Sequence, residues 1–229
     1  MLLRIANRLG ITLFSIAAVI VISFALTRLL PGDTAAYFAG PAATEQAIQE
    51  VRVKLGLDKS KPEQFVRYLA DLSRGDLGQA LSTGQPVTRD LITRLPASAE
   101  LTLFALLISM SIAIPLGVFA AVKEGSFVDH AARIIATAGV SLPVFFTGLL
   151  LSYFFYFRWG LSPAPNGRLD IIYSAPAHVT GFYLIDSLIE RNGEVFMASL
   201  KQLLLPAATL AIFSLAPITR ITRASMLSV

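Results

Sequence analysis

The sequence predicts an all-α, polytopic membrane protein, and three observations lead to that class. Hydrophobic residues make up 55% of the 229-residue chain and charged residues only 15%. Two long apolar runs, 101–122 and 134–157, exceed the roughly 20 residues that a helix needs to cross a bilayer. Neither run contains a charged residue. Because backbone groups find no water in hydrocarbon, each spanning run must be a helix rather than a single strand.

Four spans are expected in all. The N-terminal region, 1–33, combines a tail with a retained first helix whose apolar run covers 11–26. A cleaved signal peptide is the alternative, but the run ends in Arg-Leu-Leu-Pro-Gly-Asp and not at a small-residue cleavage site. The transmembrane domain, 96–229, holds the other three spans. These lie near 99–122, 134–157 and 203–219.

Residues 34–95 are expected to form a helical, water-facing insert outside the membrane. Apolar residues recur at helical spacing in three short segments, the last of which, 87–95, leads into Pro96 as the first turn of the next helix. Ser60 with Glu63 has the pattern of a capping box. A solvated linker is the alternative, but three amphipathic faces in succession favour a folded insert.

Two further aqueous segments separate the later spans. A short charged loop at 123–130 joins the two central spans. The segment 159–202 contains a strong turn signal at 162–167, and residues 183–188 are expected to form a short helix.

Positive charge beside the spans sets the predicted orientation. The arginine and lysine residues at 4–8, 123–133 and 220–223 fall on one side of the membrane when four spans alternate. The positive-inside rule makes that side cytoplasmic. The N-terminus is therefore expected in the cytoplasm, and both large loops face outward.

Several classes of function are disfavoured. The chain has no cysteine and only two isolated histidines, so neither a metal site nor any other cofactor is expected. No basic stripe with interleaved aromatics indicates a nucleic-acid partner, and no P-loop indicates ATP binding by this chain. A membrane-embedded enzyme is an alternative, but the intramembrane serines share no span with a histidine or carboxylate.

The candidate functional residues are uncharged side chains within the spans. No span has a charged residue at its centre, which disfavours a carrier coupled to an ion gradient. The residues expected to line a translocation path are Ser109, Ser111, Pro115, Ser141, Pro143, Thr147, Thr209 and Ser214. Arg220 and Arg223 are the candidates for the cytoplasmic exit. Helix packing, kinks or snorkelling to lipid headgroups are the alternative roles.

Motifs along the chain resemble one family of membrane proteins. They include Arg28-Leu29-Leu30-Pro31-Gly32-Asp33, Arg74-Gly75-Asp76-Leu77-Gly78, Arg94-Leu95-Pro96-Ala97-Ser98, Ser141-Leu142-Pro143-Val144-Phe145 and Thr222-Arg223-Ala224-Ser225-Met226-Leu227. In this order the set is similar to the first permease subunit of binding-protein-dependent ABC importers for dipeptides, oligopeptides, nickel or glutathione. Each motif is weak alone, but together they cover essentially the whole chain.

The resemblance implies a six-span permease of the bacterial inner membrane that is not itself an enzyme. It implies a second permease as heterodimer partner, two cytoplasmic ATP-binding subunits, and an extracytoplasmic solute-binding protein. In that family a Glu-Ala-Ala coupling loop follows the segment at 222–227, and this chain ends at Val229 before it. The expected function is part of a translocation path for peptides or related small solutes. The alternative is a truncated, non-transporting membrane protein that serves as an anchor or sensor.

Overall fold

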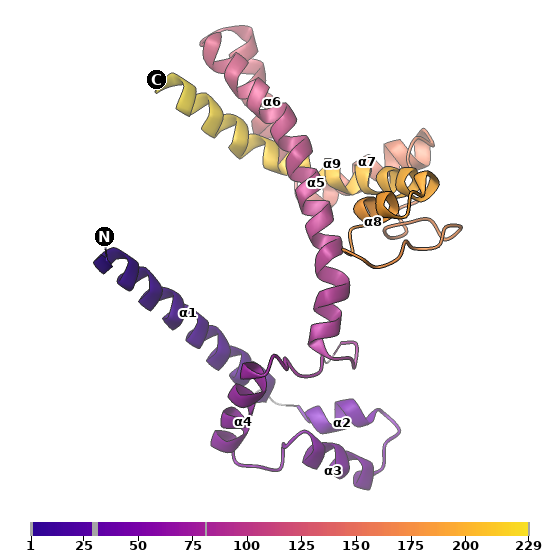
Figure 1. The fold of residues 1–229 in the computed structure, drawn as a ribbon. Coiled ribbons are helices and arrows are strands. Elements are labelled where there is room, and N and C mark those ends of the chain that lie inside the picture. The colour runs from indigo at the N-terminus through magenta and orange to yellow at the C-terminus, as the bar shows by residue number, and fades with distance from the viewer. Residues whose placement is uncertain (1, 29–31, 81, 229) are drawn as a thin grey trace. The chain divides into compact units, whose positions relative to one another are not determined.

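The structure is a computed structural model that describes residues 2–28, 32–80 and 82–228. In these ranges the regular elements are helices, which confirms the predicted all-α class (Figure 1). The chain divides into two compact units, Met1–Leu91 and Ile92–Val229.

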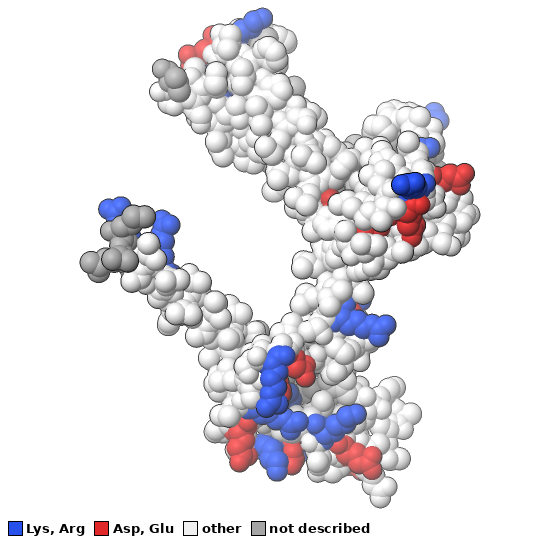
Figure 2. Space-filling view, in the orientation of Figure 1, with Lys and Arg blue, Asp and Glu red and all other residues white. Residues whose placement is uncertain are grey.

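The first unit contains one long apolar helix and three short polar ones. Helix α1 is long and apolar enough to cross a membrane, as expected for the first span. In Figure 2 the length of α1 is white, and charged atoms gather at its start and over the short helices. The four helices are α1 (Leu2–Arg28), α2 (Thr34–Ala39), α3 (Glu45–Lys54) and α4 (Lys61–Ser73).

Aromatic packing joins the end of α1 to α4. The ring of Phe24 lies 5.0 Å from that of Phe65 and 5.8 Å from that of Tyr68, measured between centroids. Lys61 Nζ also donates a hydrogen bond to the carbonyl of Arg28 at 2.9 Å. These contacts attach the polar helices to the end of the apolar one.

Local capping signals define the short helices. The predicted capping box is present at α4, where Glu63 Oε2 accepts a hydrogen bond from Ser60 N at 3.1 Å. Asp33 caps α2 and lies 2.5 Å from Arg52 Nη2. The backbone N–H of Ala36, together with the positive charge of Arg52, holds the pKa of Asp33 below its usual value.

The second unit is built around the long helix α9, on which shorter helices pack. Helix α5 includes the boundary between the two units. Segments α6, α7 and α8 each pack against α9. The elements are α5 (Val87–Val122), α6 (Phe127–Ser141), α7 (Val144–Leu151), the π-helix η1 (Ser152–Arg158), α8 (Tyr183–Ile189) and α9 (Gly193–Leu227).

Helix α5 starts earlier than expected. Pro96 was predicted for the first turn of a new helix, but it lies inside one continuous helix that starts at Val87. The sequence 87–95 contains no glycine that would end the preceding turn. Membrane helices tolerate the missing proline N–H when neighbouring groups compensate.

The expected span at 134–157 is not one uninterrupted helix. Helix α6 ends at Ser141, and Leu142 is extended, with φ −98° and ψ 139°. Pro143 disfavours helical backbone at the preceding residue and then caps α7. The described part of the chain therefore has three helices long enough to span a membrane, together with a shorter apolar helix at Val144–Arg158.

The predicted loop at 123–130 is shorter in the structure. Helix α6 already begins at Phe127, with Ser126 as its N-cap residue. Asp129 and His130 therefore lie in the first turn of a helix and not in a loop. Ser126 is extended, and its hydroxyl donates to the carbonyl of Lys123 instead of capping the helix.

Helix α9 extends past both ends of the predicted span at 203–219. Asn192 caps it, and its side chain accepts a hydrogen bond from Val195 N at 3.1 Å. The helix continues through Pro206 and Pro217 to Leu227. The short helix expected at 183–188 is present as α8.

Small side chains let α5 approach α9 closely. A Cβ atom built on Gly117 would lie only 2.7 Å from Thr222 Cβ and 2.9 Å from the carbonyl oxygen of Thr219. Small residues at such contacts are typical of membrane helix pairs. The buried small residues on the two helices include Ala105, Ser109, Ala113, Gly117, Ala120, Ala121, Ser199, Ala207, Ala211, Ala216 and Thr219.

Candidate functional site

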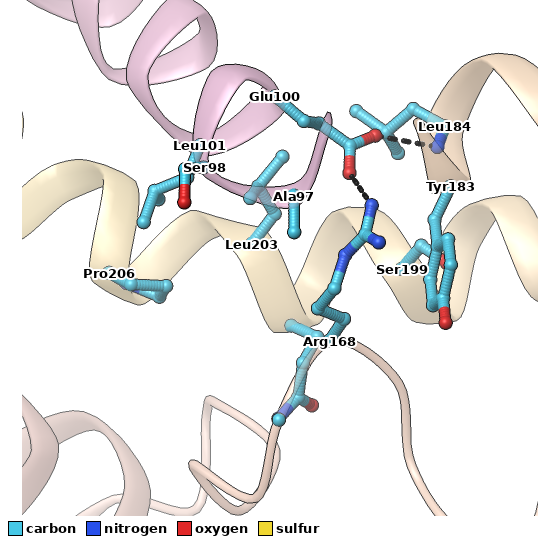
Figure 3. Close-up of a pocket in the computed structure, with 12 residues that line it drawn as sticks. Ala97, Ser98, Glu100, Leu101, Arg168, Tyr183, Leu184, Ser199, Leu203 and Pro206 are labelled. Atoms are coloured by element: carbon cyan, nitrogen blue, oxygen red, sulfur yellow. Dashed lines mark hydrogen bonds and ion pairs between the residues drawn. The ribbon is translucent and has the colours of Figure 1, made fainter. Parts of the chain in front are cut away.

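A cavity of about 300 Å³ lies in the second unit, between residues 97–101 of α5, the segment that leads into α8, and α9 (Figure 3). Most of its wall is apolar, but several polar side chains face it. These are Ser98, Glu100, Arg168, Tyr183, Ser199 and Gln202.

Glu100 ties the segment before α8 to helix α5. Its Oε2 accepts a hydrogen bond from Arg168 Nη2 at 2.6 Å, and its Oε1 accepts one from Leu184 N at 2.8 Å (Figure 3). The carboxylate is almost fully buried, with 7% of the side chain exposed. Because both oxygens are satisfied, this buried charge is compensated.

Arg168 is held in a defined plane. Its Nη2 also donates to the carbonyl of Gly181 at 2.8 Å, and its guanidinium carbon lies 3.7 Å from the ring centre of Tyr183. Gly181 has φ +80°, and a Cβ there would lie 2.7 Å from Pro96 Cβ. Glycine is therefore required where this segment crosses α5.

Asp186 orders the same segment from the start of α8. Burial alone would raise the pKa of Asp186, but hydrogen bonds from the hydroxyl and N–H of Thr180 and from Gly181 N lower it overall. The N–H of Gly181 lies 2.9 Å from Asp186 Oδ2. The wall of the cavity is thus preorganised by two carboxylates, Glu100 and Asp186.

A second cavity of about 420 Å³ adjoins the first one. The two share Leu101, Gly167, Gln202 and Pro206 in their walls. The second is also lined by α7 and by Thr209 of α9, whose Cγ2 would lie 3.4 Å from a Cβ on Gly148. The two neighbouring cavities, together called the hollow, lie along α9 and are largely apolar.

Among the predicted path residues, the structure places Thr209 in this hollow. The hydroxyls of Ser111, Ser141, Thr147 and Thr209 donate to the carbonyl oxygen four residues earlier in their own segments. That pattern matches the expected alternative role of backbone hydrogen bonding. The other four predicted path residues line neither cavity. Pro115 and Pro143 are exposed, Ser214 is half-buried, and Ser109 is buried.

The other end of the second unit carries an ion-pair cluster. Arg223 donates to Asp129 through Nε at 2.8 Å and through Nη2 at 2.9 Å. Asp129 is buried, with 1% of its side chain exposed, and Arg133 lies 3.6 Å away. The hydrogen bonds from Arg223 lower the pKa of Asp129. Arg220, the other predicted exit residue, is exposed.

Sequence reasoning missed most of the polar groups in the first cavity. Glu100 was visible only as a charge at the end of an apolar run, and its partner Arg168 lies 68 residues away. Ser199 and Gln202 fell in a predicted aqueous segment and lie inside α9. The one local signal for this site was Glu100, a carboxylate four residues after Pro96 and directly before an uncharged run.

The polar groups of the first cavity are few, and protein partners fix several of them. In the described residues no group of three or more potential ligand side chains is placed to hold a metal ion. The hollow offers apolar walls with a few fixed polar groups, as small-molecule sites do.

Two family models match the chain. The model described as "Binding-protein-dependent transport system inner membrane component" matches residues 113–229, and its N-terminal companion matches residues 1–102. The chain is 44% identical, over 93% of its length, to the probable D,D-dipeptide transport system permease protein DdpB of Escherichia coli K12. It is 38% identical over its whole length to the di/tripeptide transport system permease protein DppB of Pseudomonas aeruginosa. It covers 62% of the first relative and 68% of the second.

Proposed function

Because the chain belongs to the family of binding-protein-dependent transport system inner membrane components, we propose that it is a permease subunit of an ATP-driven importer. The observation that carries this proposal is the match to both family models, which between them cover most of the chain. The permease acts in the bacterial inner membrane as a multi-pass protein.

The proposed cargo is a short peptide. The relatives are permeases of dipeptide, D,D-dipeptide and di/tripeptide transport systems. The adjoining cavities support a small cargo, because their volumes of about 300 and 420 Å³ suit a ligand of a few residues.

The proposed path runs along α9 through these cavities. Its walls are mainly apolar, with a few polar side chains that can offer hydrogen bonds to the cargo. Thr209 is the candidate that the second cavity supports most directly. The other residues predicted for the path line neither cavity and stay predictions: Ser109, Ser111, Pro115, Ser141, Pro143, Thr147 and Ser214.

Energy and cargo delivery are assigned to partner subunits. We place the ATPase activity on two cytoplasmic subunits. A related second permease pairs with this one, and a solute-binding protein outside the membrane delivers the cargo. The N-terminus is placed in the cytoplasm, with Arg220 and Arg223 at the exit. The contact of Arg223 with Asp129 supports part of this orientation, since the basic flanks at 123–133 and 220–223 then share one end of the second unit.

Peptide uptake tests the proposal. The complete gene and its neighbouring transport genes are expressed in cells that lack their own dipeptide permeases, and uptake of radiolabelled dialanine is measured. The expected result is uptake that disappears when only this gene is deleted. Equal uptake with and without the gene contradicts the proposal.

A further inference from the structure

Exposed aromatic residues gather at the end of the α7–η1 segment. Residues 153–159, here called the aromatic collar, contain six aromatic residues in seven positions, and the seventh is Arg158. All six aromatic residues are exposed, from 36% for Phe155 to 73% for Phe157. A concentration of exposed rings like this one is unusual on a surface that meets only water, so the collar calls for a partner.

The collar faces all directions around its helix. Trp159 N donates to the carbonyl of Phe154, five residues earlier, at 3.0 Å, as in a π-helix. The five consecutive residues 153–157 therefore complete about one turn, and each of them stays exposed. The ring of Trp159 packs on those of Phe154 and Phe155, with centroids 5.6 Å and 5.2 Å apart. A protein groove can cover one face of this collar, whereas lipid can surround all of it.

The collar also lies where an apolar segment ends. Phe145 and Leu149 are exposed along α7, and the predicted turn at 162–167 follows the collar. The eight residues of α7 and the seven of η1 extend over about 22 Å, less than the roughly 30 Å of a bilayer core. The length of such a short helix does not fix its depth in the membrane, so a group at its end must do so.

We propose that the aromatic collar anchors η1 in the headgroup region of the lipid bilayer. Tyr153, Tyr156 and Trp159 each combine an apolar ring with a polar O–H or N–H, and such side chains favour the membrane–water interface. Arg158 is exposed beside them and extends its guanidinium to the lipid phosphates. The anchor sets the depth of α7, which lines the second cavity, and it does not depend on which cargo the protein carries.

Trp159 is itself the probe for this proposal, because residues 1–229 contain no other tryptophan. The full-length protein, with the subunits that co-purify with it, is placed in lipid nanodiscs. Their phosphatidylcholine carries bromine, which quenches tryptophan, either close to the headgroup or near the ends of the acyl chains. The emission of Trp159 is taken as the difference between the wild type and Trp159→Phe. Trp159 is expected to lose most of its emission to the shallow bromine, and much less to the deep bromine or to iodide in the water.

Leu149 provides a matched control at greater depth. It is exposed in α7 and lies ten residues before Trp159, which is about 15 Å along a helix. Leu149→Trp, combined with Trp159→Phe, is expected to lose more emission to the deep bromine than to the shallow one. Equal depths for the two positions would overturn the anchor.

Three further results overturn the proposal. Strongest quenching of Trp159 by iodide places the collar in water, and strongest quenching by the deep bromine places it in the hydrocarbon core. Quenching by neither bromine nor iodide places the collar against protein, such as a second permease.

Discussion

Replacing Gly117 by alanine tests the close contact of α5 and α9 that shapes the second unit. The new Cβ would lie 2.7 Å from Thr222 Cβ and 2.9 Å from the carbonyl oxygen of Thr219. Carbon atoms in contact normally lie about 3.5–4.0 Å apart, so the helices must separate by about 1 Å. The carbonyl is backbone, and no side-chain rotation can relieve that part of the clash.

The expected magnitude follows from two opposing terms. Overpacking of this kind costs about 1–3 kcal/mol, and alanine recovers about 1 kcal/mol through its better helix propensity. The net expectation for Gly117→Ala is a loss of about 0–2 kcal/mol in the free energy of unfolding relative to the wild type, and of about 1–3 kcal/mol relative to a glycine-to-alanine change without a clash.

Gly10 provides the matched control for this substitution. It lies in α1, and a Cβ there would meet no atom within 4 Å. Gly10→Ala is therefore expected to leave stability unchanged or to raise it by about 1 kcal/mol or less. Both variants are compared with the wild type by denaturant unfolding in detergent micelles, followed by circular dichroism. If Gly117→Ala proves as stable relative to the wild type as Gly10→Ala does, the close contact is refuted.

Three further predictions concern orientation, pH and the cavity wall. Residues 1–229 contain no cysteine, so single introduced cysteines can report topology. Ser82→Cys is expected to react with an impermeant thiol reagent in intact cells, and Lys123→Cys only after lysis. The reverse labelling pattern contradicts the predicted orientation. Asp129 has a lowered pKa in the folded state, so its stabilising contribution is present above the unfolded pKa of about 3.9 and is lost as pH falls through the lower folded value. The acid side of a stability–pH curve is expected to flatten in Asp129→Asn, and an unchanged slope contradicts the role of Arg223 as its partner. Glu100→Ala, which leaves Arg168 without its partner, is expected to lower stability by about 2 kcal/mol in denaturant unfolding, and an unchanged midpoint speaks against the pair.

Much of the fold was accessible from sequence because its signals are local. The apolar runs in α1, α5 and α9 predicted long helices, and the Ser60–Glu63 spacing predicted a cap that is present. The break at Leu142–Pro143 was missed because apolar residues continue on both sides of it. The hydropathy of a segment indicates that it can lie in lipid, but it does not indicate where the helix within that segment is interrupted.

The candidate site was less accessible because its contacts join distant segments. Glu100 and Arg168 lie 68 residues apart, and Asp129 and Arg223 lie 94 apart. Nothing in the local sequence around Ser199 distinguishes its unpartnered hydroxyl from that of Thr209, which bonds its own helix. Such differences depend on the shape of the surrounding cavity.

Chemical blocking of the second cavity tests the central claim most directly, namely that cargo passes along α9. Thr209→Cys introduces a thiol into the cavity wall, and residues 1–229 contain no other. ATP-driven dialanine uptake is measured in proteoliposomes that contain the full-length protein and its partners, before and after treatment with a bulky charged thiol reagent. The account predicts that complete modification stops uptake in Thr209→Cys and leaves the equally treated wild type active. Full uptake by the completely modified variant would contradict it.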